Sequence, residues 1–186
     1  MKRKKNTRFN LKPRTVAVII IATIIGSMGG FLNDTLYDFS AVDENKITIK
    51  HINSIHDGDT INITTHNNKK VKIRLYGIDA PELKQPFGEQ SQLCLEEMIK
   101  NQNISYIPRN KNKSTDKYGR TVAVIFKGNT NINLEMVKKG CAWNYMYYNK
   151  SLYTIFAQIT AKNKKAGLWA DNNPQAPWDY RKQTKQ

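Results

Sequence analysis

The stretch ITIKHINSIHDGDTINITTHNNKKVKIRLY, from residue 47 to residue 76, decides the fold of this 186-residue chain. Ile47 to Ile55 and Thr60 to Thr65 are rich in β-branched residues, and the turn-forming residues His56 to Asp59 separate them. After a second polar turn, Val71 to Tyr76 alternates apolar and polar side chains with the period of a half-buried strand. The stretch therefore predicts three consecutive short strands.

Two further strands and three helices are expected after this stretch. The strands cover Ile104 to Pro108 and Thr121 to Phe126, and the helical patterns cover Phe87 to Asn101, Asn133 to Gly140 and Leu152 to Ala166. With one helix between the third and fourth strands and the others after the fifth, the order predicts an α+β fold, a five-stranded OB-fold β-barrel with three helices. A three-stranded sheet with helices is the alternative.

Apolar residues recur at helical spacing in the first and last of these helices. In the first, Leu93, Met98 and Ile99 lie near one face. In the last, the apolar positions recur about one turn apart, at Leu152, Ile155, Phe156 and Ile159. Both patterns favour helix over strand.

The N-terminal region reads as a membrane or export segment. Thr15 to Asn33 contains no charged residue, and seven cations but no acid precede it, which can place a spanning segment with its N-terminus in the cytoplasm. A cleaved signal peptide is the alternative, and a buried soluble helix is a third. Either export interpretation places the rest of the chain outside the cytoplasm, membrane-anchored or, after cleavage, secreted.

The predicted organisation follows from this segment. A basic cytoplasmic flank covers residues 1–14, the transmembrane anchor or signal segment covers 15–33, and a polar linker covers 34–46. One globular domain covers 47–182, and 183–186 form a tail. A chain of this length has room for one compact domain, and we expect a monomer.

The chain is strongly basic, with 30 Lys and Arg against 15 Asp and Glu and a net charge of +15. Without the seven N-terminal cations, the cations of the remaining chain still outnumber its acids. Such a surplus attracts a polyanion, either nucleic acid or an anionic lipid surface. The charge alone does not choose between them.

The two cysteines, Cys94 and Cys141, allow only one pairing. In an exported protein they can form a disulfide, whereas two small buried thiols are the alternative. Both alternatives stay open at this point.

Acidic residues gather in two predicted turns. Asp57 and Asp59 lie in the turn after the first strand, and Asp79 and Glu82 lie three residues apart where the third strand ends, with Arg74 on that same strand. Each turn alone is typical of a surface loop whose Asp side chains cap their own backbone. A third polar loop, from Ser114 to Arg120, enters the last strand and is by itself an ordinary surface loop.

Together, the three loops match the needs of phosphodiester hydrolysis. That reaction needs a cation on the phosphoryl oxygens, an oriented water, and positive charge where the transition state develops negative charge. Carboxylate oxygens favour Ca²⁺ or Mg²⁺ over zinc. Arg74 and Arg120 are suited to hold phosphate because a guanidinium can contact two oxygens at once.

Five segments in this order and spacing resemble the staphylococcal nuclease (thermonuclease) family. They are HDGDT at residue 56, IRLYGIDAPE at 73, TDKYGR at 115, GCAW at 140 and GLWADNNPQAPW at 167, and the resemblance covers about residues 50 to 180. It implies an OB-fold barrel with three helices and a nuclease that cuts DNA and RNA to 3′-phosphate and 5′-hydroxyl products. Ca²⁺ is the cofactor that the resemblance implies.

The resemblance also implies the ligands of the metal. Asp59 and Asp79 resemble the carboxylate ligands of one Ca²⁺, and the main-chain carbonyl of Ala80 resembles a further ligand. Asp57 resembles the nearby acid that helps to hold the water of the metal. Glu82 resembles the residue that orients or deprotonates the attacking water.

The remaining roles concern the phosphate and the nucleotide. Arg74 and Arg120 resemble the pair that clamps the phosphate, and Lys117, Tyr118 and Tyr148 match positions that contact the bound nucleotide. Among the departures, Met146 replaces one of the two nucleotide-contacting tyrosines of the family, and the loop after Glu82 is short. Ala80 stands where the best-known member has Thr, a small change for a main-chain ligand.

Two other functions compete with this interpretation. An inactive OB-fold module, tethered to the membrane, would bind nucleic acid without cleaving it, but such relatives usually lack the acids or arginines present here. A protein that binds anionic lipid would explain the N-terminal cations, but it leaves the acidic turns without a purpose.

Overall fold

The computed structural model describes residues 46–100, 103–109 and 115–184. The predicted basic flank, apolar segment and all of the linker but Lys46 lie outside the described residues. Within the described part of the chain, no helix has the length and apolarity needed to cross a membrane.

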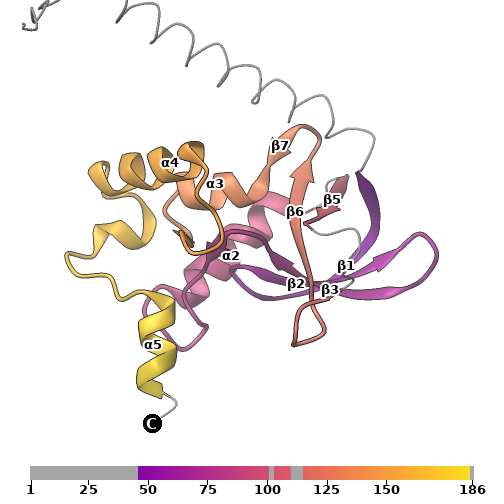
Figure 1. Cartoon of the computed structure of the whole chain (residues 1–186), viewed down its shortest axis with the longest axis horizontal. Helices are drawn as coiled ribbons and strands as arrows, with labels where there is room; N and C mark the ends of the chain where they lie inside the picture. The colour runs from indigo at the N-terminus through magenta and orange to yellow at the C-terminus, as the bar shows by residue number, and fades with distance from the viewer. Residues whose placement is uncertain (1–45, 101–102, 110–114, 185–186) are drawn as a thin grey trace, which may run out of the picture. The chain divides into compact units, whose positions relative to one another are not determined.

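Five strands close into a barrel (Figure 1): β1 (Ile47–Asp57), β2 (Thr60–Thr65), β3 (Lys70–Leu75), β5 (Ile104–Pro108) and β6 (Thr121–Lys127). The order β3-β2-β1-β5-β6 is antiparallel throughout, and a parallel pairing of β3 with β6 closes the ring. This closure confirms the five-stranded barrel and excludes the three-stranded sheet.

One short strand extends the barrel sheet, and two others form a separate two-stranded sheet. β7 (Thr130–Asn131) pairs with the end of β6. β4 (Ile78–Asp79) pairs with β8 (Trp143–Asn144), so that the turn after β3 is tied to a segment more than 60 residues further along the chain.

The core of the barrel is built from β-branched and aliphatic side chains that face inward on alternate positions. Ile61 and Ile63 of β2, Ile73 and Leu75 of β3, and Ile125 of β6 are at most 1% exposed. Burial of each such side chain stabilises the fold by about 1.5–3 kcal/mol before the entropy cost. The alternation is the reason that the strands were predictable.

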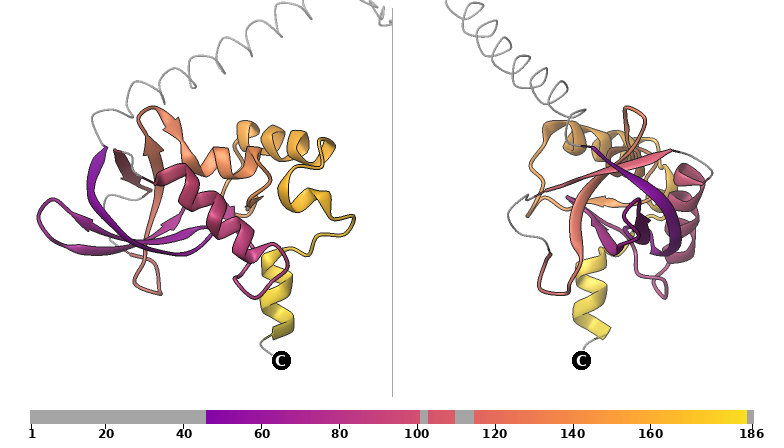
Figure 2. Two further views of the ribbon diagram at one scale, coloured as in Figure 1. Left: turned by 180° about the vertical axis from the view of Figure 1, so that it is seen from behind. Right: turned by 90° about the vertical axis from the view of Figure 1, so that its right-hand side faces the viewer.

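Four α-helices accompany the barrel among the described residues, in place of the three predicted. They are α2 (Gly88–Ile99), α3 (Ile132–Lys138), α4 (Leu152–Asn163) and α5 (Pro177–Thr184). A short 3₁₀ helix, η2 (Gly167–Ala170), follows α4. Helix α5 was missed because it has no apolar period; Pro177 occupies its first position, where a missing N–H costs nothing. Figure 2 shows α2 alongside the barrel and α5 apart from α3 and α4.

The apolar pattern of α4 does not face the core. Leu152, Phe156 and Ile159 are 45%, 62% and 47% exposed, whereas the small residues Ala157 and Ala161 are buried. In α2, similarly, Leu93 points to solvent while Leu95, Met98 and Ile99 pack into the barrel core. The helices were predicted correctly, but the buried face of α4 is the one with small side chains.

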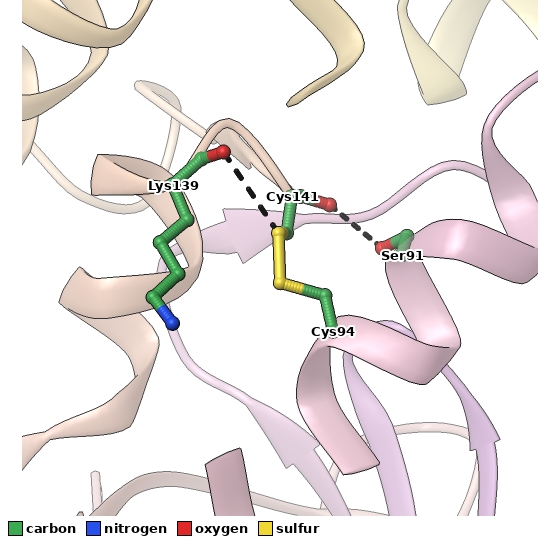
Figure 3. The surroundings of a disulfide bond; sticks show 4 residues. All are labelled: Ser91, Cys94, Lys139 and Cys141. Atoms are coloured by element: carbon green, nitrogen blue, oxygen red, sulfur yellow. Dashed lines mark hydrogen bonds between the residues drawn. A yellow bond between two sulfur atoms is a disulfide. The ribbon is translucent and has the colours of Figure 1, made fainter. Parts of the chain in front are cut away.

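A disulfide joins Cys94 of α2 to Cys141, in the turn after α3 (Figure 3). The hydroxyl of Ser91, one turn before Cys94, donates a hydrogen bond of 2.7 Å to the carbonyl of Cys141. Two bonds therefore tie the two segments together, and the choice that the sequence left open is resolved in favour of pairing.

Candidate active site

The turns after β1 and β3 meet through the carboxylate of Asp59. Its Oδ2 accepts a hydrogen bond of 2.7 Å from the Ala80 N–H, and its Oδ1 accepts one of 3.0 Å from the Thr60 hydroxyl. The Leu75 N–H donates to the Asp59 carbonyl at 2.8 Å. Asp59 is 4% exposed, so these contacts fix its carboxylate in position.

Asp59 and Asp79 converge on the guanidinium of Arg74. Arg74 Nη2 lies 2.9 Å from Asp59 Oδ2 and 2.8 Å from Asp79 Oδ1. Arg74 Nη1 donates to the carbonyls of Leu75 and Ile78, each at 2.9 Å. The carboxylates of the two turns thus share one positive charge, and the Arg74 side chain, 14% exposed, is not an ordinary solvated strand residue.

The pKa of the Asp59 carboxyl reflects its burial and the charges of its neighbours. Burial raises the pKa of Asp59 to about 8; the Arg74 charge opposes this rise, the neighbouring charges of Asp57 and Asp79 add to it, and the Ala80 N–H opposes it. Opposite charge and hydrogen bonding stabilise the ionised form, whereas burial and like charge oppose it. A further cation beside Asp59 would therefore favour its ionised form.

Asp57 has a local role in the first turn. Its Oδ1 accepts a hydrogen bond of 3.0 Å from the Asp59 N–H, which caps the turn. Gly58 between them approaches α2 so closely that an added Cβ would lie 1.9 Å from the Ser91 Oγ. The glycine is needed here because the turn is pressed against the helix.

Glu82 lies at the edge of the cluster and is 37% exposed. Its Oε1 accepts a hydrogen bond of 2.7 Å from Arg181 Nη1, and its N–H donates to Gln85 Oε1 at 3.2 Å. The spacing of Asp79 and Glu82 predicted that they would be neighbours, and Arg181 contacts both.

Arg181 is the residue of this cluster that sequence reasoning missed. Its Nη2 lies 2.7 Å from Asp79 Oδ2, and its Nη1 lies 3.2 Å from Asp79 Oδ1. Burial alone would lower the pKa of Arg181, but the hydrogen bonds and charges of Asp79 and Glu82 hold it above its ordinary value. The two turns contain more acids than cations, which could have suggested that a further cation lies nearby. The sequence could not identify that cation as a residue 102 positions from Asp79.

Arg120 lies outside the carboxylate cluster. Its Nε and Nη2 donate to Asp116 Oδ2 at 3.0 and 2.8 Å, and the N–H groups of Tyr118 and Arg120 donate to Asp116 Oδ1, each at 2.9 Å. Burial alone would raise the pKa of Asp116, but the hydrogen bonds from Arg120 and Tyr118 lower it. Arg120 directly precedes β6, whose Val122 lies opposite Arg74, so its loop adjoins β3 near Arg74.

The predicted nucleotide contacts are exposed aromatic and basic side chains. Tyr118 is 65% exposed, and Lys117 Nζ and Arg120 Cζ lie 5.0 and 5.2 Å from its ring centroid. Tyr148 is 58% exposed, and the hydroxyl of Tyr76 donates to its carbonyl at 2.6 Å. Met146, in the same loop as Tyr148, is 53% exposed. None of these side chains contacts the carboxylates through a hydrogen bond among the described residues.

A basic hollow of about 640 Å³ adjoins the Arg120 loop. Three lysines from the turn before β3 and from β3 itself line it, together with Thr115 and Gly119: Lys69, Lys70 and Lys72. The carboxylates of the cluster do not line this hollow. Apolar side chains share its wall with these lysines: Ile47, Val71, Tyr106 and Pro108.

The donor set of the cluster fits a hard divalent cation. Among the described residues, no group of three or more His, Cys, Asp and Glu side chains is arranged to hold a metal. The predicted ligands are the side chains of Asp59 and Asp79 and the main-chain carbonyl of Ala80, with Asp57 predicted to help hold the water of the metal. All these donors are oxygens, which suit Ca²⁺ with water completing the coordination.

Comparisons with known proteins agree with this geometry. The model of a family described as "Staphylococcal nuclease homologue" matches residues 72–171. An "Uncharacterized endonuclease" from Haemophilus influenzae is 43% identical over 146 residues, which are 78% of this chain and 79% of the relative. A "Micrococcal nuclease" from Shigella flexneri is 36% identical over 142 residues, 70% of this chain and 79% of the relative.

A plant protein is also similar. A staphylococcal-like nuclease from Arabidopsis thaliana is 37% identical over 114 residues, which are 61% of this chain but only 34% of the relative.

Proposed function

Because the chain belongs to the staphylococcal nuclease family and is a nuclease hydrolase, we propose that it is a calcium-dependent enzyme that hydrolyses phosphodiester bonds of both DNA and RNA. The observation that carries the proposal is the convergence of Asp59 and Asp79 on Arg74 at 2.9 and 2.8 Å. Two acidic turns meeting one guanidinium provide oxygen donors and phosphate-binding charge at the same place.

Asp59, Asp79 and the main-chain carbonyl of Ala80 would hold the calcium ion, with Asp57 close enough to contact its water. When bound, the ion would supply positive charge to a phosphoryl oxygen. Asp59 would bind the ion in its ionised form, in which it already pairs with Arg74.

The side chains supply the rest of the reaction. Arg74 and Arg120 would bind non-bridging oxygens of the scissile phosphate. Arg120 would exchange its partner Asp116 for the substrate, and Arg74 would use the Nη2 donors that Asp59 and Asp79 release when they bind the ion. Glu82 would orient the water and accept its proton at Oε2, since Oε1 is engaged by Arg181. As the water oxygen bonds to phosphorus, the bond to the 5′ oxygen breaks. The 5′ oxygen takes up a proton from a solvent water and Glu82 later returns its proton to solvent, which leaves a 3′-phosphate and a 5′-hydroxyl.

Nucleic acid contacts would extend from this centre along the basic surface. Lys117, Tyr118 and Tyr148 would contact the nucleotide, and the lysines of the basic hollow would follow the backbone. Stacking on an exposed tyrosine contributes about 1–3 kcal/mol per base and tolerates any sequence. Stacking contacts the base and not the sugar, so it is compatible with cleavage of both DNA and RNA. We propose that the enzyme acts as a monomer.

We place the nuclease domain outside the cytoplasm, anchored through residues 15–33 or released after cleavage. The Cys94–Cys141 disulfide supports this location, because disulfides persist in oxidising compartments and are rare in the cytosol. Protease treatment of intact cells tests the location, and the intact mass of the native protein tests the cleavage. A protected, full-length protein with reduced cysteines would contradict the proposal.

The activity is tested with the full chain in detergent, incubated with plasmid DNA and with RNA in Ca²⁺ or in chelator. We expect cleavage of both substrates in Ca²⁺ and of neither in chelator. The 5′ ends of the products should be phosphorylated by a kinase without prior phosphatase treatment. Retention of nucleic acid without cleavage would instead indicate an inactive binding module, and equal activity in chelator would exclude the metal.

A further inference from the structure

Helix α5 lies beyond residues 72–171, where the family model matches, yet it places a side chain in the carboxylate cluster. Its Trp178 anchors it: the ring stacks on Tyr145 at 5.4 Å with 12° between the planes, and it meets Trp143 edge-on at 5.4 Å. Before the helix, the Gln175 carbonyl accepts a hydrogen bond of 2.7 Å from the Gln85 side chain. The helix is therefore docked and not a loose end.

Trp178 and Arg181 contact residues that are neighbours in the β4–β8 pair, Trp143 and Asp79. Trp143 of β8 lies directly opposite Asp79 of β4 in the antiparallel pair. Trp178 and Arg181 are three positions apart on α5, so they lie on the same helix face. When Trp178 packs against Trp143, that face brings Arg181 to Asp79.

The guanidinium of Arg181 bridges the two acids of the second turn. It contacts both oxygens of Asp79, at 2.7 and 3.2 Å, and its Nη1 also contacts Glu82 Oε1 at 2.7 Å. The Asp79 side chain is fully buried, whereas that of Glu82 is 37% exposed. Among the described residues, Arg181 is the only hydrogen-bond donor to the Glu82 carboxylate.

We propose that Arg181 is a positioning residue of the active site, which holds the Glu82 carboxylate with Oε2 toward the attacking water and holds Asp79 in its ligand orientation. The inference rests on the proposed function, in which Glu82 and Asp79 have these roles. Arg181 acts through these acids and not through the substrate. Partners of this kind typically change activity or metal affinity by about 10–100-fold when removed.

The kinetic test compares three variants of the full chain. Arg181→Ala should lower kcat by about 10–100-fold and leave the KM for DNA within about twofold, because the substrate contacts remain. Arg181→Lys should restore part of kcat, since an ammonium can reach one carboxylate but does not bridge two as a planar guanidinium does. Lys182→Ala is the matched control: it removes one positive charge from the next position of the same helix, where the side chain is 76% exposed.

A kcat for Arg181→Ala within twofold of wild type, or above it, would overturn the inference; an increase would indicate an inhibitory contact. A rise in KM equal to the fall in kcat/KM would assign Arg181 to substrate binding. Thermal unfolding of each variant shows whether the fold is retained, and Arg181→Lys separates charge from geometry if Arg181→Ala does not fold.

A second measurement needs neither metal nor activity. In chelator, the side-chain nitrogen spectrum of ¹⁵N-arginine protein should show hindered rotation of the Arg181 guanidinium, and Glu82→Gln should weaken it. Arg109, which pairs with no carboxylate among the described residues, provides the comparison. Averaged signals from Arg181 in an active nuclease would refute the inference alone, whereas hindered signals in an inactive protein would refute only the proposed function.

Discussion

Arg74 is the residue on which the site depends, because it is the charge that Asp59 and Asp79 share. Its four contacts at 2.8–2.9 Å include two main-chain carbonyls, so the guanidinium is fixed before any substrate arrives. The two main-chain contacts keep the guanidinium in place when Asp59 and Asp79 turn to the metal, and the Nη2 donors then become available to a phosphoryl oxygen.

Replacing Arg74 should therefore reduce catalysis severely. We expect Arg74→Ala to lower the single-turnover cleavage rate by about 10³-fold or more, the scale for an arginine that stabilises a phosphoryl transition state. Arg74→Lys should recover little, since one ammonium does not reproduce the four contacts. Lys100→Ala, at the exposed end of α2, is the control. A loss below tenfold would show that the phosphate charge is supplied elsewhere.

Asp116 allows a pH test at a carboxylate that is not among the predicted metal ligands. Its lowered pKa means that the ionised form is bound more tightly in the folded chain than in the unfolded chain. The stabilisation is therefore complete above the unfolded pKa of about 3.9 and is lost as the pH falls through the lower, folded value. A carboxyl ¹³C titration of Asp116 should give a midpoint below that of an unfolded peptide. In Arg120→Ala the midpoint should move up, and an unchanged midpoint would mean that Arg120 does not hold this acid.

At the scale of elements, α4 shows what periodicity can and cannot predict. Apolar residues one turn apart identified the helix, but its buried positions are Thr154, Ala157 and Ala161. Small side chains allow this face to pack closely against its neighbours, and a hydropathy pattern gives them little weight. Periodicity thus predicted the element and not its orientation.

Because the large apolar side chains of α4 are exposed, polar substitutions at these positions should cost little stability. Phe156→Ser should change the free energy of unfolding by less than about 0.5 kcal/mol, as for surface substitutions, because the ring is 62% exposed. Leu95→Ala, at a fully buried position of α2, should cost about 2–5 kcal/mol and is the contrast. Urea unfolding of both variants measures the difference. A large loss at Phe156 would mean that another part of the chain covers this face.

At the scale of the whole molecule, features set by local interactions were predictable from the sequence, and features set by long-range contacts were not. The five barrel strands and the turn acids were predictable because alternation and turn chemistry are local. The location of Arg181 was not, because it depends on Trp178 docking against a strand that is itself paired with the β4 turn. Arg120 illustrates the intermediate case: its loop was predicted, but its pairing with Asp116 needed coordinates.

The disulfide provides the last test, since it constrains the whole domain. It links residues 47 positions apart, and closing such a loop restricts the unfolded chain by an amount worth about 2–4 kcal/mol. The double variant Cys94→Ala/Cys141→Ala should therefore unfold at lower urea concentration. It should remain folded and active at 25 °C, because Cys141 is a minor part of the aliphatic core and the Asp59–Arg74 contacts do not involve the sulfurs. Dithiothreitol should shift the wild-type midpoint and leave that of the double variant unchanged. If reductant shifts neither, the two thiols are unpaired in solution, and the support that the bond lends to an oxidising location is lost.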